Sequence, residues 1–354
     1  MEVIEVTGSA FERGCQHGKA FADKARACCE YYRVVGGLDV QDPSTARRLD
    51  LIERNVERLA PSLLDEVRGI SAGSGVPYRE VLLLNSSTEF GAIEPLVRGC
   101  TNMIMADAPH GILHGYNYDH KPGAVMRFSA GEVAALGNGR HVSCSTWPGT
   151  IWTIAGVNNA GLTQGMSGVW TVDSNWDEGI PSHMLARLPL QQCSSVPEAV
   201  ALVSQLCPIA TSYNLVFSDV HGDAAIVEKS PTGQAVRHLE GRALFCANTF
   251  VTDQMQDKLN VRNEHLLTNA RHRLQNLERL TGDKQSTWDM ARLLEILRYH
   301  SKDGGSICMH GEPGDLAGFQ SIHSYLMIPV DRRILATDGI PCQFPHLPLR
   351  TWLP

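Results

Sequence analysis

Apolar residues recur every three or four positions along the first hundred residues, which is the pattern of amphipathic helices. The clearest stretch covers residues 49–70 and contains Pro61. Because proline lacks a backbone N–H and clashes with the preceding turn, we expect it to kink or divide this helix. Nearby, the pattern predicts helices over residues 11–32 and 81–84 and a strand over residues 2–7. The N-terminal part of the chain is therefore predicted to be mainly helical.

From about residue 101 the chain contains short runs rich in β-forming residues, separated by turn signals, which predict hairpins. The predicted pairs are 102–106 with 112–118, 151–157 with 162–167, 214–219 with 224–229, 235–239 with 243–247, and 324–330 with 334–337. Two helices interrupt them, one opened by Ser195 and Glu198 and one by Ser286 and Asp289. Without a steady strand–helix alternation, this order predicts an α+β fold with antiparallel sheets in one compact catalytic domain.

The net charge, the hydropathy and the terminal residues indicate which partners and which location to expect. The chain has 354 residues, 43% of them hydrophobic, and a net charge of −7, which argues against the basic face that nucleic-acid binding needs. No apolar run approaches the roughly 18 residues of a membrane span. The first residues lack a secretory signal, and the last three are not a peroxisomal tripeptide. We therefore expect a cytoplasmic, monomeric or weakly oligomeric enzyme with no membrane or nucleic-acid partner.

The chain contains ten cysteines and fourteen histidines but neither a CxxC nor an HExxH motif. Most of the cysteines are therefore interpreted as small buried apolar residues, and no metal site or cofactor is predicted. A metalloenzyme remains the alternative, because Cys308 lies close in sequence to His310, and His114 to Asp119 and His120. A non-enzymatic binding protein is a third alternative, which predicts that Cys100 is replaceable.

One Gly-Cys step, Gly99–Cys100, stands where the helical region ends and the strands begin. Cleavage before Cys100 would leave a thiol and an α-amine on one residue. Their ordinary pKa values are about 8.5 and about 7.7–8.0, so the amine can accept the thiol proton without a histidine. Glycine suits position 99 because it has no side chain to obstruct attack on its carbonyl. From the dipeptide alone, a buried structural cysteine is the simpler interpretation.

Further motifs occur in order between residue 8 and residue 340: Phe11-Glu12, Gly14, His17-Gly18, Arg68-Gly69-Ile70, Leu84-Asn85, Thr88-Glu89-Phe90, Gly99-Cys100-Thr101, Gly115, Asn117, Asp119, Asn158, Ala160-Gly161, Pro181-Ser182-His183, Glu228, Ser230-Pro231, Asn248 and Ser306-Ile307-Cys308. In order and spacing they resemble the acyl-CoA:isopenicillin N (6-aminopenicillanic acid) acyltransferase family. The resemblance implies the αββα sandwich of N-terminal-nucleophile hydrolases. It also implies self-cleavage into a helical α chain, 1–99, that stays associated with a β chain, 100–354.

The resemblance also assigns roles to residues. Cys100 matches the nucleophile, Asp119 a carboxylate near the new α-amine, and Asn248 the amide donor of the oxyanion hole. Weaker matches suggest substrate or support roles for Thr101, Asn102, Asn117, Ser230 and Ser306. Without the resemblance, Asp119, Asn248 and Asn117 are read as turn or strand-end residues.

The chain also departs from that family. An arginine of the penicillin enzymes falls near Gly318, His120-Lys121 replaces aromatic residues, and Asn102 replaces a threonine. The penicillin-forming reaction is therefore not implied, although the thioester chemistry is. We expect transfer of an acyl group from a small-molecule donor, with acyl-CoA as a candidate substrate, to an amine. The alternative is an amidohydrolase of N-acyl amines, such as β-alanyl amines, or peptides, with water as acceptor.

Overall fold

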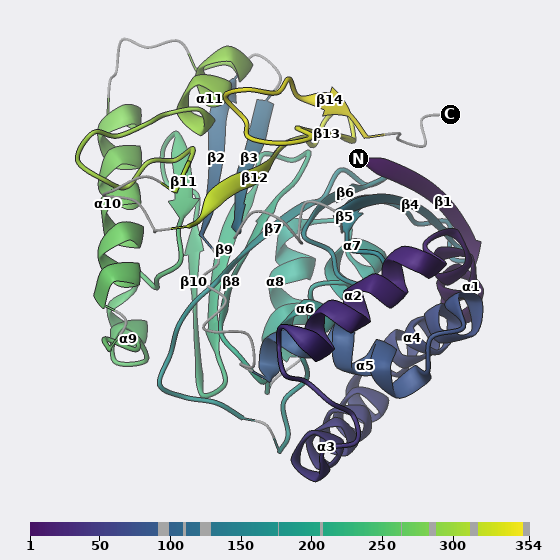
Figure 1. The fold of residues 1–354 in the computed structure, drawn as a ribbon. Helices are drawn as coiled ribbons and strands as arrows, with labels where there is room; N and C mark the ends of the chain where they lie inside the picture. The colour runs from purple at the N-terminus through teal and green to yellow at the C-terminus, as the bar shows by residue number, and fades with distance from the viewer. Residues whose placement is uncertain are drawn as a thin grey trace.

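The structure is a computed structural model, and it describes residues 1–90, 99–108, 111–120, 129–175, 177–205, 208–262, 264–282, 288–311 and 318–349. Two β-sheets form its centre (Figure 1). Along the eight-stranded sheet lie β1 (Glu2–Gly8), β4 (Ala130–Leu136), β5 (His141–Thr146), β6 (Ala155–Asn158), β7 (Thr163–Gly168), β8 (Tyr213–Ser218), β9 (Ala224–Ser230) and β10 (Gly233–His238). Along the six-stranded sheet lie β11 (Ala243–Cys246), β2 (Cys100–Ala108), β3 (Gly111–His120), β12 (Gln320–Ile328), β13 (Arg333–Ala336) and β14 (Leu347–Pro348).

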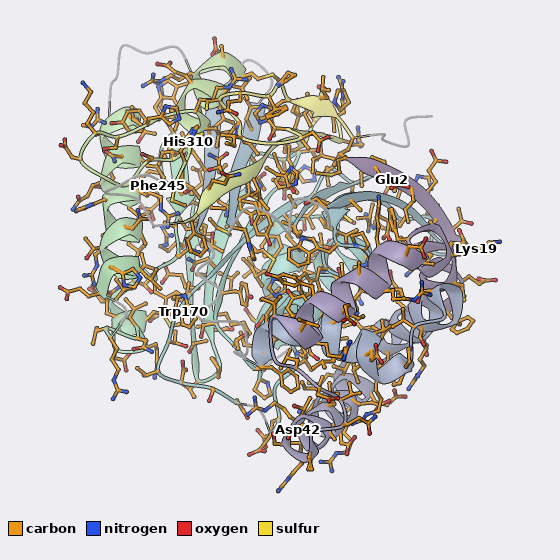
Figure 2. The ribbon with its side chains drawn as sticks, viewed as in Figure 1. Glu2, Lys19, Asp42, Trp170, Phe245 and His310 are labelled. Carbon is orange, nitrogen blue, oxygen red and sulfur yellow. The ribbon has the colours of Figure 1, made fainter. Side chains whose placement is uncertain are left out.

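Helices cover the outer faces of both sheets. On the six-stranded sheet, α10 (Glu264–Thr281) contacts β11, and α11 (Met290–Leu297) contacts β3. On the eight-stranded sheet lie α7 (Leu188–Gln192) and α8 (Val196–Gln205), next to the short α6 (Ser182–Leu185). The sheets contact each other through β2 with β7 and β12 with β6, and side chains fill the space between the layers (Figure 2). The predicted α+β class and αββα layering are therefore confirmed.

The N-terminal helices pack at the far side of the molecule from α10 (Figure 1). They are α1 (Ala10–Ala20), α2 (Ala22–Val34), α3 (Pro43–Leu59), α4 (Pro61–Ser74) and α5 (Tyr78–Asn85), followed by a short 3₁₀ turn, Ser87–Glu89. Glycines form the contact between α1 and α4: Gly14, Gly18, Gly69 and Gly73. A Cβ on Gly14 would lie 2.1 Å from the carbonyl oxygen of Glu66, so a larger residue would force the two helices apart.

This close crossing brings charged side chains into the core. Arg187, only 1% exposed, donates to the carboxylates of both Glu66 on α4 and Glu132 on β4. Arg13 lies 3.4 Å from Glu66, and His17 Nδ1 lies 2.9 Å from Glu132. Buried charges are tolerated only when they are paired and hydrogen-bonded, which this network achieves.

The network makes the stability depend on pH. Burial alone would raise the pKa of Glu132, but the Arg187 charge and the His17 hydrogen bond outweigh it and hold this pKa well below the ordinary 4.5. A carboxyl with a lowered folded-state pKa stabilises the fold above its unfolded pKa, and the stabilisation is lost as the pH falls toward the folded value. We expect the free energy of unfolding, measured with urea, to decrease below about pH 5. The decrease should be shallower in Glu132→Gln, and equal slopes would contradict this assignment.

Several elements follow the sequence pattern. The structure confirms the strand at the N-terminus, the division of the long helix before Pro61 and the short helix α5. It also confirms four predicted hairpins, β2–β3, β6–β7, β8–β9 and β12–β13. The predicted helix over 11–32 is two helices, because the chain leaves helical geometry at Phe21. The helix α11 begins after Asp289, whose side chain accepts from the Arg292 N–H, while Ser286 lies outside the described residues.

One predicted hairpin was wrong. Residues 235–239 and 243–247 do not form a hairpin, because β10 pairs with β9 and β11 pairs with β2 in the other sheet. The named strands pair antiparallel, as predicted, except that β1 pairs with β4 in parallel. The intervening helices separate these two strands, so no tight turn forces them to run in opposite directions. Within the described residues, no helix has both the length and the apolar character needed to cross a membrane.

Candidate active site

Cys100 is the first residue of β2 and directly follows Gly99. It lies opposite Tyr118 of β3, and its side chain faces the apolar layer between the two sheets. Only 2% of Cys100 is exposed, and its Sγ lies 3.3 Å from the hydroxyl of Tyr116. Burial, followed by the neighbouring Cys100, raises the pKa of Tyr116 well above its ordinary value. Tyr116 therefore stays protonated and can donate a hydrogen bond to a thiolate.

The peptide bond before Cys100 is held on both sides. The carbonyl oxygen of Gly99 accepts the backbone N–H of Asp119 at 2.8 Å, and the N–H of Cys100 donates to Oδ1 of Asn248 at 2.7 Å. A Cβ on residue 99 would lie 2.2 Å from Met309 Cε and 2.7 Å from Asp119 Oδ2. Glycine is thus required here for space, because any side chain would collide with both neighbours.

The structure brings Asp119 and Asn248 to the Gly99–Cys100 bond, as the resemblance implied, with differences in detail. The carboxylate of Asp119 accepts the Ser321 hydroxyl and lies against Gly99, while Asn248 Oδ1 contacts the Cys100 nitrogen. The amide nitrogen of Asn248 donates to the Gly168 carbonyl oxygen at 2.9 Å. The oxyanion-hole role of Asn248 and the amine-holding role of Asp119 stay predictions.

An arginine that the sequence analysis missed completes this site. Arg273 on α10 is fully buried, and its guanidinium donates to the Cys100 carbonyl oxygen at 2.7 Å and to Asn248 Oδ1 at 2.8 Å. It also donates to Thr101 Oγ1 at 2.9 Å and to Asn269 Oδ1 at 2.9 Å. Its guanidinium therefore holds the Cys100 carbonyl and the Asn248 amide oxygen in place next to the Gly99–Cys100 bond. Arg273 lies on α10, a helix that the sequence analysis did not predict.

A signal for α10 was present in the sequence. Its buried residues Leu266, Ala270 and Leu277 recur with helical spacing, and Arg273 falls on the same stripe. A charged residue on an apolar helix face indicates a buried ionic or polar site, because such a charge is costly without partners. That irregularity was the available clue to Arg273.

The other predicted support residues have different surroundings. Thr101 belongs to the Arg273 network, whereas Asn102 bonds to Ser167 and His114 on the inter-sheet side. Asn117 donates to the carbonyl oxygens of Leu297 and Ile307, which ties β3 to the end of α11 and the loop after it. The hydroxyl of Ser230 donates to Asp173, and Ser306 closes a local turn with Ser301. These hydrogen bonds of Ser230 and Ser306 do not involve Cys100, Asp119 or Asn248.

Replacing Arg273 tests its role as a positioning residue. We expect Arg273→Met to slow the reaction of Cys100 by about 10²–10³-fold, the usual cost of losing one preorganised donor, and Arg273→Lys to recover part of the rate. Rates of chain cleavage and of turnover would be measured alongside thermal unfolding. The control is Arg271→Met, an exposed position on the same helix. Equal rates in Arg273→Met and wild type would refute the role.

Comparisons with known proteins identify one matching family and several partly similar proteins. The model of one family, acyl-coenzyme A:6-aminopenicillanic acid acyl-transferase, matches residues 105–335. A curated relative, the 40 kDa form of acyl-coenzyme A:6-aminopenicillanic-acid-acyltransferase from Emericella nidulans, is 25% identical over 219 residues. The match covers 60% of this chain and 59% of that relative, so it spans less than two thirds of the relative's length.

Two solved structures are similar in part. One is an orthologue of N-acylethanolamine-hydrolysing acid amidase from Caenorhabditis elegans, with 14% identity, a TM-score of 0.47, and coverage of 65% of this chain and 93% of that one. The other is penicillin V acylase from Agrobacterium tumefaciens, with 15% identity, a TM-score of 0.41, and coverage of 67% and 82%. At these values the activities of the two enzymes are not transferred to this chain.

Proposed function

Because this chain belongs to the acyl-coenzyme A:6-aminopenicillanic acid acyl-transferase family, we propose that it is a self-processing enzyme that carries acyl groups as a thioester on Cys100. One observation carries the proposal: the Gly99–Cys100 peptide bond lies between hydrogen-bonding groups suited to its cleavage. The Asp119 N–H is bonded to the Gly99 oxygen and the Asn248 amide oxygen to the Cys100 nitrogen.

The first step is an attack of the Cys100 thiolate on the carbonyl carbon of Gly99. The N–H of Asp119, 2.8 Å from the Gly99 oxygen, would stabilise the negative charge that develops on this oxygen. The bond to the Cys100 nitrogen then breaks, the nitrogen takes up a proton and becomes an α-amine, and a Gly99 thioester forms on Sγ. Water hydrolyses this thioester, giving the Gly99 carboxylate and a free thiol.

After cleavage, residue 100 would hold both nucleophile and base. The α-amine, with an ordinary pKa of about 7.7–8.0, would take the thiol proton as Sγ attacks the carbonyl carbon of the acyl donor. Asn248 Oδ1, already 2.7 Å from this nitrogen, would orient the amine, and its amide nitrogen is the proposed oxyanion donor. The leaving thiol or amine of the donor takes up the proton, and the acyl group remains on Cys100. An amine or water then attacks the thioester and regenerates the thiol.

The uncut chain is a closed precursor in this proposal. Cys100 is 2% exposed and lies within the inter-sheet core, so an external acyl donor cannot reach Sγ before the chain is cut and rearranged. The α chain, 1–99, would stay bound afterwards, because its helices share a buried core with the strands of the β chain.

The mass of the purified protein under denaturing conditions tests the proposal. We expect two polypeptides, residues 1–99 and 100–354, the second beginning with Cys100. A fully active single chain of 354 residues would refute self-processing. Assays with an acyl-CoA, with and without 6-aminopenicillanic acid or another amine, then distinguish the acceptors. An acylated amine supports the transferase, while release of free acid at the same rate in both assays supports the hydrolase alternative.

A further inference from the structure

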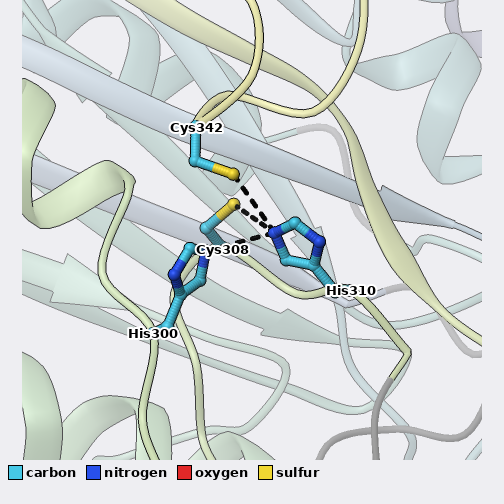
Figure 3. Close-up of side chains that lie close together, drawn as sticks. All are labelled: His300, Cys308, His310 and Cys342. Atoms are coloured by element: carbon cyan, nitrogen blue, oxygen red, sulfur yellow. Dashed lines mark hydrogen bonds between the residues drawn. The ribbon is translucent and has the colours of Figure 1, made fainter.

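Four side chains of the types that ligate metals converge at the end of the six-stranded sheet, outside the site described above. His300, Cys308 and His310 belong to the loop that follows α11, and Cys342 belongs to the segment after β13 (Figure 3). Each offers one ligand atom, and the four atoms all lie within 4.8 Å of one another. Two sulfurs and two imidazole nitrogens therefore face a common point.

The spacing of these atoms fits a tetrahedral ion. His310 Nε2 lies 3.1 Å from His300 Nε2, 3.2 Å from Cys342 Sγ and 3.6 Å from Cys308 Sγ. Four ligands at about 2.0–2.3 Å from a zinc ion, at tetrahedral angles, lie roughly 3.3–3.8 Å apart. The three separations from His310 are thus close to those of a tetrahedral zinc site, and the remaining pairs, all within 4.8 Å, would draw together around an ion.

The chemistry of the donors selects the metal. A Cys₂His₂ set with four protein ligands is typical of structural zinc, whereas calcium and magnesium require oxygen ligands. His300 and Cys342 are exposed, and Cys308 is buried. An ion can therefore enter from solvent, and the buried ligand does not have to leave the core to bind it.

We propose that these four residues bind one Zn²⁺ ion that fastens the loop 300–310 to the C-terminal segment. Binding converts the two thiols to thiolates and releases their two protons, while both imidazoles bind as neutral rings. With all four positions filled by protein, the ion leaves no open site for a substrate and is structural. The proposal does not depend on the proposed function.

The ion would lie close to the Gly99–Cys100 bond, separated from it by Met309. Met309, between two of the ligands, packs against Gly99, and its backbone N–H donates to Ser321, whose hydroxyl donates to Asp119. An ion that holds Cys308 and His310 in place therefore also holds Met309 against Gly99 and Ser321 against the Asp119 carboxylate.

Metal analysis of the purified, tag-free protein tests the site. We expect about one zinc per chain, and after removal and replacement by Co²⁺ a visible absorption spectrum typical of tetrahedral thiolate coordination. Cys342→Ser, at an exposed position, should bind zinc at least roughly tenfold more weakly and lose that spectrum. Cys15→Ser, which removes a half-buried cysteine on α1, is the matched control and should retain both.

A stability measurement makes the test independent of ligand variants that fail to fold. Chelation should lower the melting temperature of the wild type clearly more than that of Cys342→Ser. Wild type without stoichiometric zinc and without the Co²⁺ spectrum would overturn the proposal. So would a mass two hydrogens lower in the absence of reductant that maps to a Cys308–Cys342 disulfide.

Discussion

A Cys100→Ala chain is expected to remain a single polypeptide of 354 residues and to lose acyl transfer and hydrolysis together. In the proposed chemistry the same sulfur attacks Gly99 and then the substrate, so its removal abolishes both reactions. The loss of turnover should be about 10⁴-fold or more, as for other enzymes deprived of their nucleophile. Cys100→Ser should cut itself slowly or not at all, because a hydroxyl is a much weaker nucleophile at neutral pH.

A second cysteine provides the control. Cys246 is also fully buried, on the strand β11 next to β2, and burial raises the pKa of its thiol to about 12. At neutral pH it is therefore an unreactive thiol, and the Cys246→Ala chain should still be cleaved between Gly99 and Cys100. Intact mass, N-terminal sequencing and turnover would be measured for all three variants. A cut Cys100→Ala chain would assign the cleavage to another group or to a contaminating protease.

The largest loss of stability is expected from Arg187→Met. The substitution removes the cation that Glu66 and Glu132 share while leaving both carboxylates buried. Removing one partner of a buried ion pair typically costs about 3–5 kcal/mol. Here the two buried carboxylates would lose their shared cation and keep only Arg13 and His17 as partners. Methionine fits the space approximately, so the effect reports the charge rather than a cavity.

Urea unfolding of the wild type and Arg187→Met measures this effect. The control is Arg79→Met, which breaks an exposed ion pair with Asp50 of 2.7 Å and should cost a small fraction of the Arg187 loss. The double change Glu66→Gln and Glu132→Gln in the Arg187→Met background should recover part of the stability. A loss no greater than that of Arg79→Met would mean that the network contributes little.

The sequence alone determined the features that depend on neighbouring residues. Helical spacing and Pro61 predicted the divided helix, and turn signals predicted four of the hairpins. The change from helical to strand-forming sequence at Gly99–Cys100 located the start of β2. Each of these features depends on residues that are only a few positions apart, so a local sequence pattern is enough to predict it. The family motifs added Asp119 and Asn248, which both reach the Gly99–Cys100 bond in the structure.

Only the tertiary structure decided which distant residues share a site. Arg273 is 173 positions from Cys100, and Cys342 is 32 positions from His310, yet each pair is in contact. Similarly, β10 and β11 look like one hairpin in sequence but belong to different sheets. Local periodicity reports which face of an element is buried, but not which other element covers that face. The Gly99–Cys100 bond, where we propose cleavage, could therefore be located from the sequence, whereas Arg273 beside it and the proposed metal site near it required the fold.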